Sequence, residues 1–169
     1  MFRVLLGLGA NLGDREKNLT AAWSLLGTHE GIRLIRLSSF YRTEPVGGPP
    51  GQPEYLNAAG LIETNIEPME LLGIMLEIEV RLGRVRTVPH GPRTIDLDLL
   101  LYGQKVMQND TLSLPHPYLH ERLFVLKPAA EIASEMIHPV FQTAIQSLLT
   151  NLLHSKIKSK NSKKQKNSF

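Results

Sequence analysis

Residues 91 to 103, GPRTIDLDLLLYG, place two carboxylates near the start of an otherwise apolar segment. The apolar run from Ile95 to Tyr102 predicts a buried β-strand. Side chains alternate between the two faces of a strand, so we expect Asp96 and Asp98 to share one face. The same alternation assigns Thr94, Leu100 and Tyr102 to that face, and Ile95, Leu97, Leu99 and Leu101 to the other.

Asp96 and Asp98 are close enough on such a strand to repel each other. Side chains two residues apart are separated by about 6.5–7 Å, and two charges at that distance repel by about 2.4 kcal/mol at an effective dielectric constant near 20. A cation held by both carboxylates reverses the sign of this energy, and Mg²⁺ prefers carboxylate and phosphate oxygens as ligands. The pair therefore predicts a magnesium site that accepts a polyphosphate, with a solvated strand end as the alternative.

The 169 residues suit one domain whose core is large enough to fold without covalent cross-links. The chain has no cysteine, which excludes disulfides, thiolate metal ligands and a cysteine nucleophile. The apolar run at the N-terminus is interrupted by Gly7 and Gly9, and the sequence predicts neither a signal peptide nor a membrane span. We expect a soluble, cytoplasmic protein.

The positive net charge comes from residues 155 to 169, which hold six lysines and no acidic residue. The whole chain has a formal charge of +3, whereas residues 1–154 alone have a formal charge of −3. The segment has the polar, low-complexity composition of disordered chains. We expect a folded domain over 1–154 and a disordered, lysine-rich tail over 155–169. A solvated tail is favoured over contact with nucleic acid or anionic lipid.

Apolar patterning predicts that strands and helices alternate along the chain. Strands are expected over 2–8, 32–41, 55–64 and 95–102, and helices over about 19–26, from Pro68 to Gly83, and through Phe141, Ile145, Leu148 and Leu152. The glycines at 7, 9 and 13 do not complete a dinucleotide-binding fingerprint, because Leu12 stands where the third glycine is needed. The elements indicate a two- or three-layer α/β or α+β domain.

Two irregular segments, 44–54 and 83–93, separate these elements, and arginines cluster around the second. They are Arg81, Arg84, Arg86 and Arg93. Guanidinium groups match the geometry of phosphate oxygens. Next to a carboxylate pair the cluster predicts polyphosphate binding, with a solvated charge run as the alternative. His116 and Arg122 are candidates for the same pocket, or else a loop histidine and a helix-surface arginine.

Tyr55, Asn57 and Phe124 are candidates for binding a flat heterocycle. The two rings can stack on such a ligand, although each is more often part of a core. An amide buried on a strand must find hydrogen-bond partners, and the polar edge of a heterocycle supplies both donors and acceptors.

Six segments occur in a characteristic order: GLGANLGD, SSFYRTEPVG, QPEYLNAA, EVRLGRVR, HGPRTIDLDLLLYG and LPHPYLHERLFVLKP. Together they resemble the 6-hydroxymethyl-7,8-dihydropterin pyrophosphokinase family of folate biosynthesis. The resemblance extends from about residue 3 to residue 150, and GPRTIDLDLLLYG is its most specific part.

The resemblance implies an α+β fold, a ferredoxin-like three-layer α-β-α sandwich with a largely antiparallel sheet. It implies transfer of pyrophosphate from ATP to the hydroxymethyl group of 6-hydroxymethyl-7,8-dihydropterin, with release of AMP. The protein is expected to be a monomer with these two small-molecule substrates and to require neither a membrane nor nucleic acid. Segments 44–54 and 83–93 correspond to mobile catalytic loops whose closure excludes water.

The resemblance also implies roles for individual residues. Two Mg²⁺ ions that arrive with ATP would be bound by Asp96 and Asp98, and Arg84 and Arg93 would hold the phosphates. The ATP site would comprise Glu79, Arg84, Arg93, Leu99, Ser113, His116 and Arg122. The pterin site would comprise Thr43, Val46, Tyr55, Asn57, Asp96 and Phe124, with the ring between Tyr55 and Phe124.

Two other functions compete with this interpretation. A nucleotidyltransferase also pairs a glycine-rich turn with an Asp-x-Asp strand, but it expects the strand soon after the turn and releases pyrophosphate. A ferredoxin-like RNA-binding module needs exposed aromatic residues on its sheet and a basic folded surface, whereas residues 1–154 are net acidic.

Overall fold

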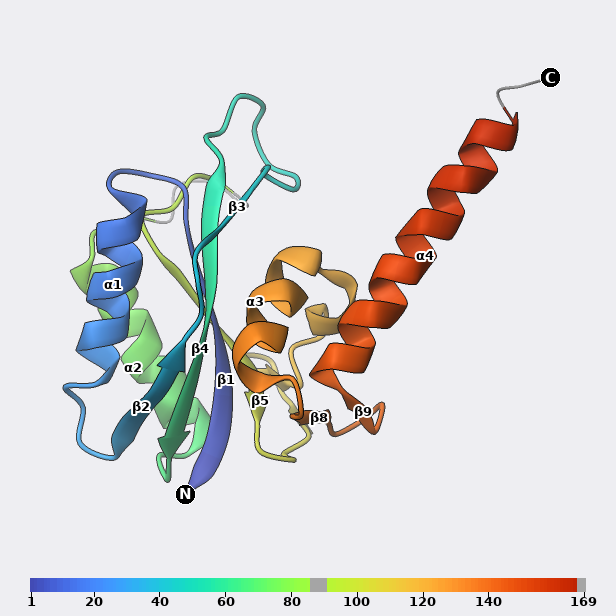
Figure 1. Ribbon diagram of the computed structural model, residues 1–169. Coiled ribbons are helices and arrows are strands. Elements are labelled where there is room, and N and C mark those ends of the chain that lie inside the picture. Colours follow the sequence, from blue (N-terminus) through green and yellow to red (C-terminus); the bar gives the residue numbers. More distant parts are fainter. Residues whose placement is uncertain (86–90, 167–169) are drawn as a thin grey trace.

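The computed structural model contains an antiparallel sheet with helices on both faces (Figure 1). It describes residues 1–85 and 91–166, without the side chains of 162–166. The strands of this sheet are β1 (Phe2–Ala10), β2 (Ile32–Leu37), β3 (Tyr41–Thr43), β4 (Tyr55–Thr64) and β5 (Asp96–Tyr102). They lie in the order β2, β4, β1, β5, and β3 pairs with the N-terminal part of β4. β1 is therefore central, between β4 and β5.

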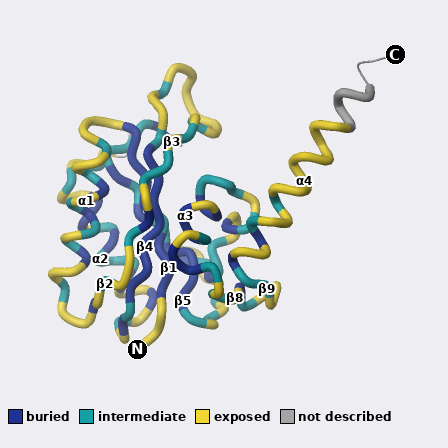
Figure 2. The backbone as a smooth tube through the Cα atoms, viewed as in Figure 1, coloured by how far each residue is buried: buried dark blue, intermediate teal, exposed yellow. Residues whose placement is uncertain are grey.

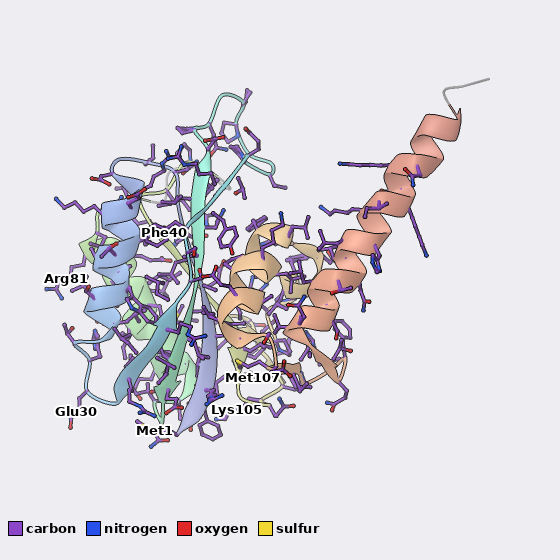
Figure 3. The ribbon with its side chains drawn as sticks, in the orientation of Figure 1. Met1, Glu30, Phe40, Arg81, Lys105 and Met107 are labelled. Carbon is purple, nitrogen blue, oxygen red and sulfur yellow. The ribbon has the colours of Figure 1, made fainter. Side chains whose placement is uncertain are left out.

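Two helices cover each face of the sheet (Figure 1). Helices α1 (Arg15–Leu26) and α2 (Pro68–Arg81) pack on one face. Helix α3 (Leu123–Ala133) and the first turns of α4 (Ile145–Lys166) pack on the other. Figure 2 shows the buried strands between the two helical layers, and Figure 3 shows side chains filling both spaces. The expected three-layer sandwich with an antiparallel sheet is confirmed.

Short elements connect this framework. They are β6 (Met107–Gln108), β7 (Ser113–Leu114), the 3₁₀ turn η1 (Leu119–Glu121), β8 (Ile137–His138) and β9 (Thr143–Ala144). Helix α1 begins at a cap in which the Asp14 side chain accepts a hydrogen bond from the Lys17 N–H at 3.1 Å. Helix α2 begins at Pro68, and Gly83 follows its end with a φ of +83°.

The predicted strand 32–41 is divided in the structure. β2 ends at Leu37, and the Ser38 hydroxyl then accepts a hydrogen bond from the Ala59 N–H at 2.9 Å. The Ser38 N–H donates to the Ala59 carbonyl, also at 2.9 Å. A side-chain oxygen has thus replaced a backbone carbonyl in the ladder, and the chain resumes pairing as β3 at Tyr41.

The predicted alternation along 94–102 fails in its second half because β5 contains a bulge. Leu6 pairs with Leu99 and Leu5 with Leu101, so the register skips Leu100. The Leu100 carbonyl instead accepts a hydrogen bond from the His116 N–H at 2.9 Å. Leu100 and Leu101 both pack under α3, and Tyr102 packs on the α1–α2 side, opposite to the expectation.

Residues 155–166 are helical in the structure, where their composition led us to expect disorder. The segment contains no glycine or proline, and lysine and glutamine are good helix formers, so the helix that begins in the core can continue through it. The helix starts at Ile145, and Phe141, which was expected in it, precedes it. Within the residues that the structure describes, no helix is both long and apolar enough to cross a membrane.

Candidate active site

A pocket of about 390 Å³ opens on the α3 side of the sheet. Its floor is formed by β1, β4 and β5. Its walls are formed by the end of β3 and the segment after it, Arg93 before β5, the last residue of η1, the start of α3 and one residue of α4. The sheet contributes Gly7, Leu8, Gly9, Tyr55, Asn57, Ala58, Asp96 and Asp98. The walls contribute Thr43, Glu44, Val46, Gly47, Arg93, Glu121, Arg122, Leu123, Phe124, Val125 and Lys156.

Two glycines of β1 lower the floor of this pocket. Gly9 pairs with Asn57 of β4 and Asp96 of β5, and Gly7 pairs with Asp98. A Cβ atom on Gly9 would lie only 3.2 Å from Oδ1 of Asn57. The central strand therefore presents no side chain between the amide on one neighbour and the carboxylates on the other, which leaves room for a flat ligand.

Asp96 is held by two arginines from segment 83–93. Its carboxylate oxygens lie 2.8 Å from Nη1 of Arg84 and 2.6 Å from Nη1 of Arg93. Arg84 also forms an ion pair with Glu79 of α2. Glu79 in turn accepts a hydrogen bond from the Leu97 N–H at 2.7 Å. These contacts fix the start of β5 against α2 and place two guanidinium groups beside the carboxylate.

Asp98 lies two residues further along the same face and has a different environment. Burial raises the pKa of Asp98 to about 7, and the negative charge of Asp96 adds to this effect. Arg122 and Arg93 act in the opposite direction. Asp98 therefore lacks the arginine partners that Asp96 has, and a hard divalent cation suits such a pair of carboxylates. Among the described residues, no three His, Cys, Asp or Glu side chains form a metal-binding cluster.

The amide of Asn11, which is only 1% exposed, joins the two irregular segments. Its oxygen accepts a hydrogen bond from the Arg93 N–H at 2.7 Å. Its nitrogen donates to the Gln52 side-chain oxygen at 3.2 Å and to the Pro53 carbonyl at 3.3 Å. The last residues of both segments are thus fixed to the end of β1.

The β4 side of the pocket carries the groups expected to bind a heterocycle. Nδ2 of Asn57 donates to Oγ1 of Thr43 at 2.6 Å, which leaves the Asn57 oxygen directed at the Gly9 floor. Burial raises the pKa of the Tyr55 hydroxyl, so the ring is neutral at physiological pH. Phe124 lines the opposite wall, and the Arg122 guanidinium carbon lies 5.7 Å from the centre of its ring.

His116 is neutral in this environment. Burial lowers the pKa of His116 to about 4, and the positive charge of Arg122 contributes to the decrease. Nδ1 accepts a hydrogen bond from the Tyr118 N–H at 3.2 Å, which assigns the proton to Nε2. His116 can therefore donate one hydrogen bond to an anionic ligand, but it contributes no charge.

The family model described as 7,8-dihydro-6-hydroxymethylpterin-pyrophosphokinase (HPPK) matches residues 5–134, well over half of the chain. The chain belongs to this family. The resemblance inferred from the six sequence segments is therefore confirmed.

Two relatives that match most of the chain are named as pyrophosphokinases, and a third is a bifunctional protein. The 2-amino-4-hydroxy-6-hydroxymethyldihydropteridine pyrophosphokinase of Bacillus subtilis is 45% identical over 131 residues, 78% of each chain. The protein of that name from Haemophilus influenzae is 39% identical over 158 residues, 94% of this chain and 98% of the relative. The bifunctional protein FolKE of Lactococcus lactis is 43% identical over 129 residues, which are only 37% of its length.

Solved structures of the HPPK family share the fold. A crystal structure of HPPK-DHPS in complex with substrates has a TM-score of 0.71 at 15% identity and covers 93% of this chain. The Plasmodium falciparum HPPK-DHPS structure with pteroate has a TM-score of 0.73 at 15% identity and covers 95%. This chain spans 44% of each of those chains.

The structure brings most of the residues predicted from the HPPK resemblance to one pocket. Nine of them line it: Thr43, Val46, Tyr55, Asn57, Arg93, Asp96, Asp98, Arg122 and Phe124. Arg84 and Glu79 lie behind Asp96. His116 lies close enough to Arg122 and Asp96 for their charges to affect its pKa. Leu99 is buried on the α1–α2 side, and Ser113 lies in β7, so neither side chain lines the pocket.

Ten other pocket residues were not predicted to belong to the site. They are Gly7, Leu8, Gly9, Glu44, Gly47, Ala58, Glu121, Leu123, Val125 and Lys156. Asn11, which supports the site from behind, was not predicted either. The alternation of Gly7 and Gly9 on one strand was visible in the sequence and could have indicated an open floor. Nothing in the local sequence indicated the others. Arg86 and the rest of 86–90, within the second predicted loop, lie outside the described residues.

Proposed function

We propose that this protein transfers pyrophosphate from ATP to the hydroxymethyl group of 6-hydroxymethyl-7,8-dihydropterin and releases AMP, as an enzyme of folate biosynthesis. The observation that carries the proposal is that the Asp96–Asp98 pair, Arg93 and the ring-binding residues of β4 and α3 line one pocket. A polyphosphate and a heterocycle can therefore be held side by side. Membership of the HPPK family supports the same reaction.

The pterin is proposed to lie over the glycines of β1, between the rings of Tyr55 and Phe124. Its polar edge faces Asn57 and Thr43, whose side chains are already hydrogen-bonded to each other. The backbone of Val46 closes the edge from the segment after β3. Hydrogen bonds to a fixed amide discriminate against rings that lack the matching donors and acceptors.

ATP is proposed to bind along the segments that carry the arginines. Arg84, Arg93 and Arg122 contribute positive charge, and His116 donates from Nε2. Glu79, the Leu99 backbone and Ser113 are assigned to the nucleotide side by the family resemblance. Two Mg²⁺ ions held by Asp96 and Asp98 would neutralise charge on the phosphates when bound.

In the reaction, the pterin hydroxyl oxygen attacks the β-phosphorus of ATP. The bond between that phosphorus and the α,β-bridging oxygen breaks, AMP leaves, and the hydroxyl proton is lost to solvent or a nearby base. Arg93 lies at the pocket and is partly exposed, so it can exchange its contact with Asp96 for one with a phosphate. Arg84 is almost fully buried and keeps Asp96 in position. These residues act by positioning and by charge stabilisation.

The catalytic domain is proposed to comprise residues 1–154, with 155–169 as a basic extension. The protein is proposed to act as a monomer in the cytoplasm, without a membrane or nucleic acid. Its partners in this proposal are its two small-molecule substrates.

The products of one incubation test the proposal. The protein is mixed with ATP, Mg²⁺ and 6-hydroxymethyl-7,8-dihydropterin, and the nucleotides are separated by chromatography. We expect AMP and pyrophosphorylated pterin in equal amounts, and no AMP without pterin. ADP would indicate an ordinary kinase, free pyrophosphate a nucleotidyltransferase, and intact ATP a binding protein.

The aspartate pair provides the matched variants. Asp98→Ala is expected to abolish AMP formation at saturating Mg²⁺, whereas replacement of the exposed Asp110 by alanine leaves it unchanged. Wild-type turnover by the Asp98 variant would overturn the assigned role of the pair.

A further inference from the structure

One face of helix α4 packs into the core over the first turns of the helix and reaches the pocket further along. Ile145, Leu148, Leu149 and Leu152 lie on this face and pack with α3 and the sheet. Their spacing of three and four residues is that of a helical stripe. One turn beyond Leu152 the same stripe places Lys156, where another apolar residue would extend the core.

Lys156 lies at the part of the pocket that is formed by the start of α3. Lys156 lines the pocket together with Glu121, Arg122 and Leu123, which form the turn at the start of α3. Beyond this point α4 extends away from the rest of the molecule (Figure 1), and residues 157–161 are exposed (Figure 2). Among the side chains of α4 that the structure describes, Lys156 is thus the last on the packed face to line the site.

The lysine is not committed to a carboxylate of the protein. Among the described residues, no carboxylate lies within ion-pair distance of Lys156, whereas Asp96 is paired with Arg84 and Arg93. Glu121, its neighbour in the pocket lining, lies 3.3 Å from Nε2 of His120. The ammonium group is therefore available to an anion that enters the pocket.

We propose that Lys156 binds a phosphate group at the mouth of this pocket, belonging either to ATP or to the pyrophosphorylated pterin product. This inference rests on the proposed function and adds a residue of the C-terminal helix to it. A lysine on a flexible stem contributes a point charge that can follow the phosphate, unlike the fixed forks of Arg84 and Arg93. Lys156 is then a binding residue and takes no part in bond making.

The test compares Lys156→Gln with Lys160→Gln. Lys160 lies one turn further along the same face, is exposed and does not line the pocket, so its variant removes the same charge from the same helix. Calorimetry with Mg²⁺ gives the Kd of each protein for α,β-methylene-ATP, for the pyrophosphorylated pterin and for the unphosphorylated pterin. Thermal denaturation checks that all proteins are folded.

We expect Lys156→Gln to weaken binding of at least one phosphorylated ligand about three- to tenfold, which corresponds to about 0.7–1.4 kcal/mol. Binding of the unphosphorylated pterin should not change, Lys160→Gln should match the wild type, and Lys156→Arg should restore affinity. The ligand whose affinity falls identifies the source of the phosphate. Equal affinities for the Lys156→Gln and Lys160→Gln proteins would overturn the inference.

Failure of this inference is distinguishable from failure of the proposed function. If the wild type forms AMP only with pterin but the two glutamine variants bind alike, the role of Lys156 alone is wrong. If the wild type forms no AMP, the proposed reaction is wrong, and with it the inference that rests on the reaction.

Discussion

The side-chain oxygen of Asn11 accepts a hydrogen bond from the Arg93 N–H at 2.7 Å, and the Asn11 N–H donates to the Arg93 carbonyl at 3.0 Å. The Asn11 amide nitrogen donates to Gln52 and Pro53. The same side chain therefore fixes the backbone of Arg93, which is proposed to bind phosphate, and the end of the segment that leads to Tyr55. The two halves of the pocket share this support.

Replacing Asn11 by alanine removes three partly buried hydrogen bonds, one from the Arg93 N–H and two to Gln52 and Pro53. We expect a loss of about 1–3 kcal/mol in the free energy of unfolding, since each such hydrogen bond contributes about 0.5–1.5 kcal/mol net. We also expect kcat to fall at least about tenfold because Arg93 is no longer held. Denaturant unfolding and steady-state AMP formation measure the two effects.

Asn11→Asp separates the two contacts. A carboxylate still accepts from the Arg93 N–H but cannot donate to Gln52 or Pro53. We expect kcat to stay closer to the wild-type value than in the alanine variant, while the KM for pterin rises. A fully stable, fully active alanine variant would show that Asn11 is not a support of the site.

Gly9 and Gly7 provide a second pair of variants. A Cβ on Gly9 would lie 3.2 Å from the Asn57 oxygen, whereas a Cβ on Gly7 would have its nearest contact at 3.5 Å, with Leu100. We expect Gly9→Ala to displace the Asn57 amide and to weaken pterin binding about tenfold or more, with a smaller effect on ATP binding. Gly7→Ala should affect pterin binding less. Fluorescence titration with pterin measures both, and equal losses would contradict the assignment of Asn57 to the pterin edge.

The raised pKa of Asp98 predicts a pH dependence of stability. The ordinary pKa of an aspartate is 3.8 and that of Asp98 in the folded protein is about 7. Between these values the folded protein holds a proton that the unfolded chain has released, so this group makes stability fall as the pH rises through that window. Asp98→Asn removes the penalty, and we expect the ligand-free variant to gain about 1–4 kcal/mol over the wild type at pH 8 and little at pH 4.

Urea unfolding at the two pH values measures this difference. Asp110→Asn, in an exposed turn, serves as the control and should show no such trend. An Asp98→Asn protein whose advantage is the same at both pH values would contradict the assigned pKa.

Long periodic segments were predictable because their signals are local. The strand 55–64 and the helix from Pro68 were recovered, since a proline start, a glycine stop and sustained periodicity all lie in the sequence itself. The division at Ser38 was not predictable, because it depends on hydrogen bonds to Ala59 of another strand. The bulge at Leu100 likewise depends on His116. Helix α3 was missed because Pro128 interrupts its pattern.

The site shows the same division between local and tertiary signals. Asp96, Asp98 and Arg93 were predictable because their motif is contiguous. The supporting role of Asn11 was not, because it requires two segments separated by about forty residues to meet at one amide. Lys156 was assigned to a tail on composition, and only its place on the packed face of α4 brings it to the pocket.

Two truncations of α4 distinguish its inner part from its outer part. Removal of residues 159–169 deletes four of the six tail lysines and keeps Lys156. We expect kcat and both KM values to stay within about twofold of the wild type, a change of only about 0.4 kcal/mol in the activation free energy.

Removal of residues 155–169 deletes Lys156 as well. We then expect the KM for ATP or the inhibition constant of the product to rise about three- to tenfold with little change in kcat. The shorter deletion also controls for lost charge. It removes four lysines, whereas the two truncated proteins differ by only two, Lys156 and Lys158. If the 159–169 deletion already reduced kcat tenfold, the outer turns of α4 would have a role that the pocket does not explain.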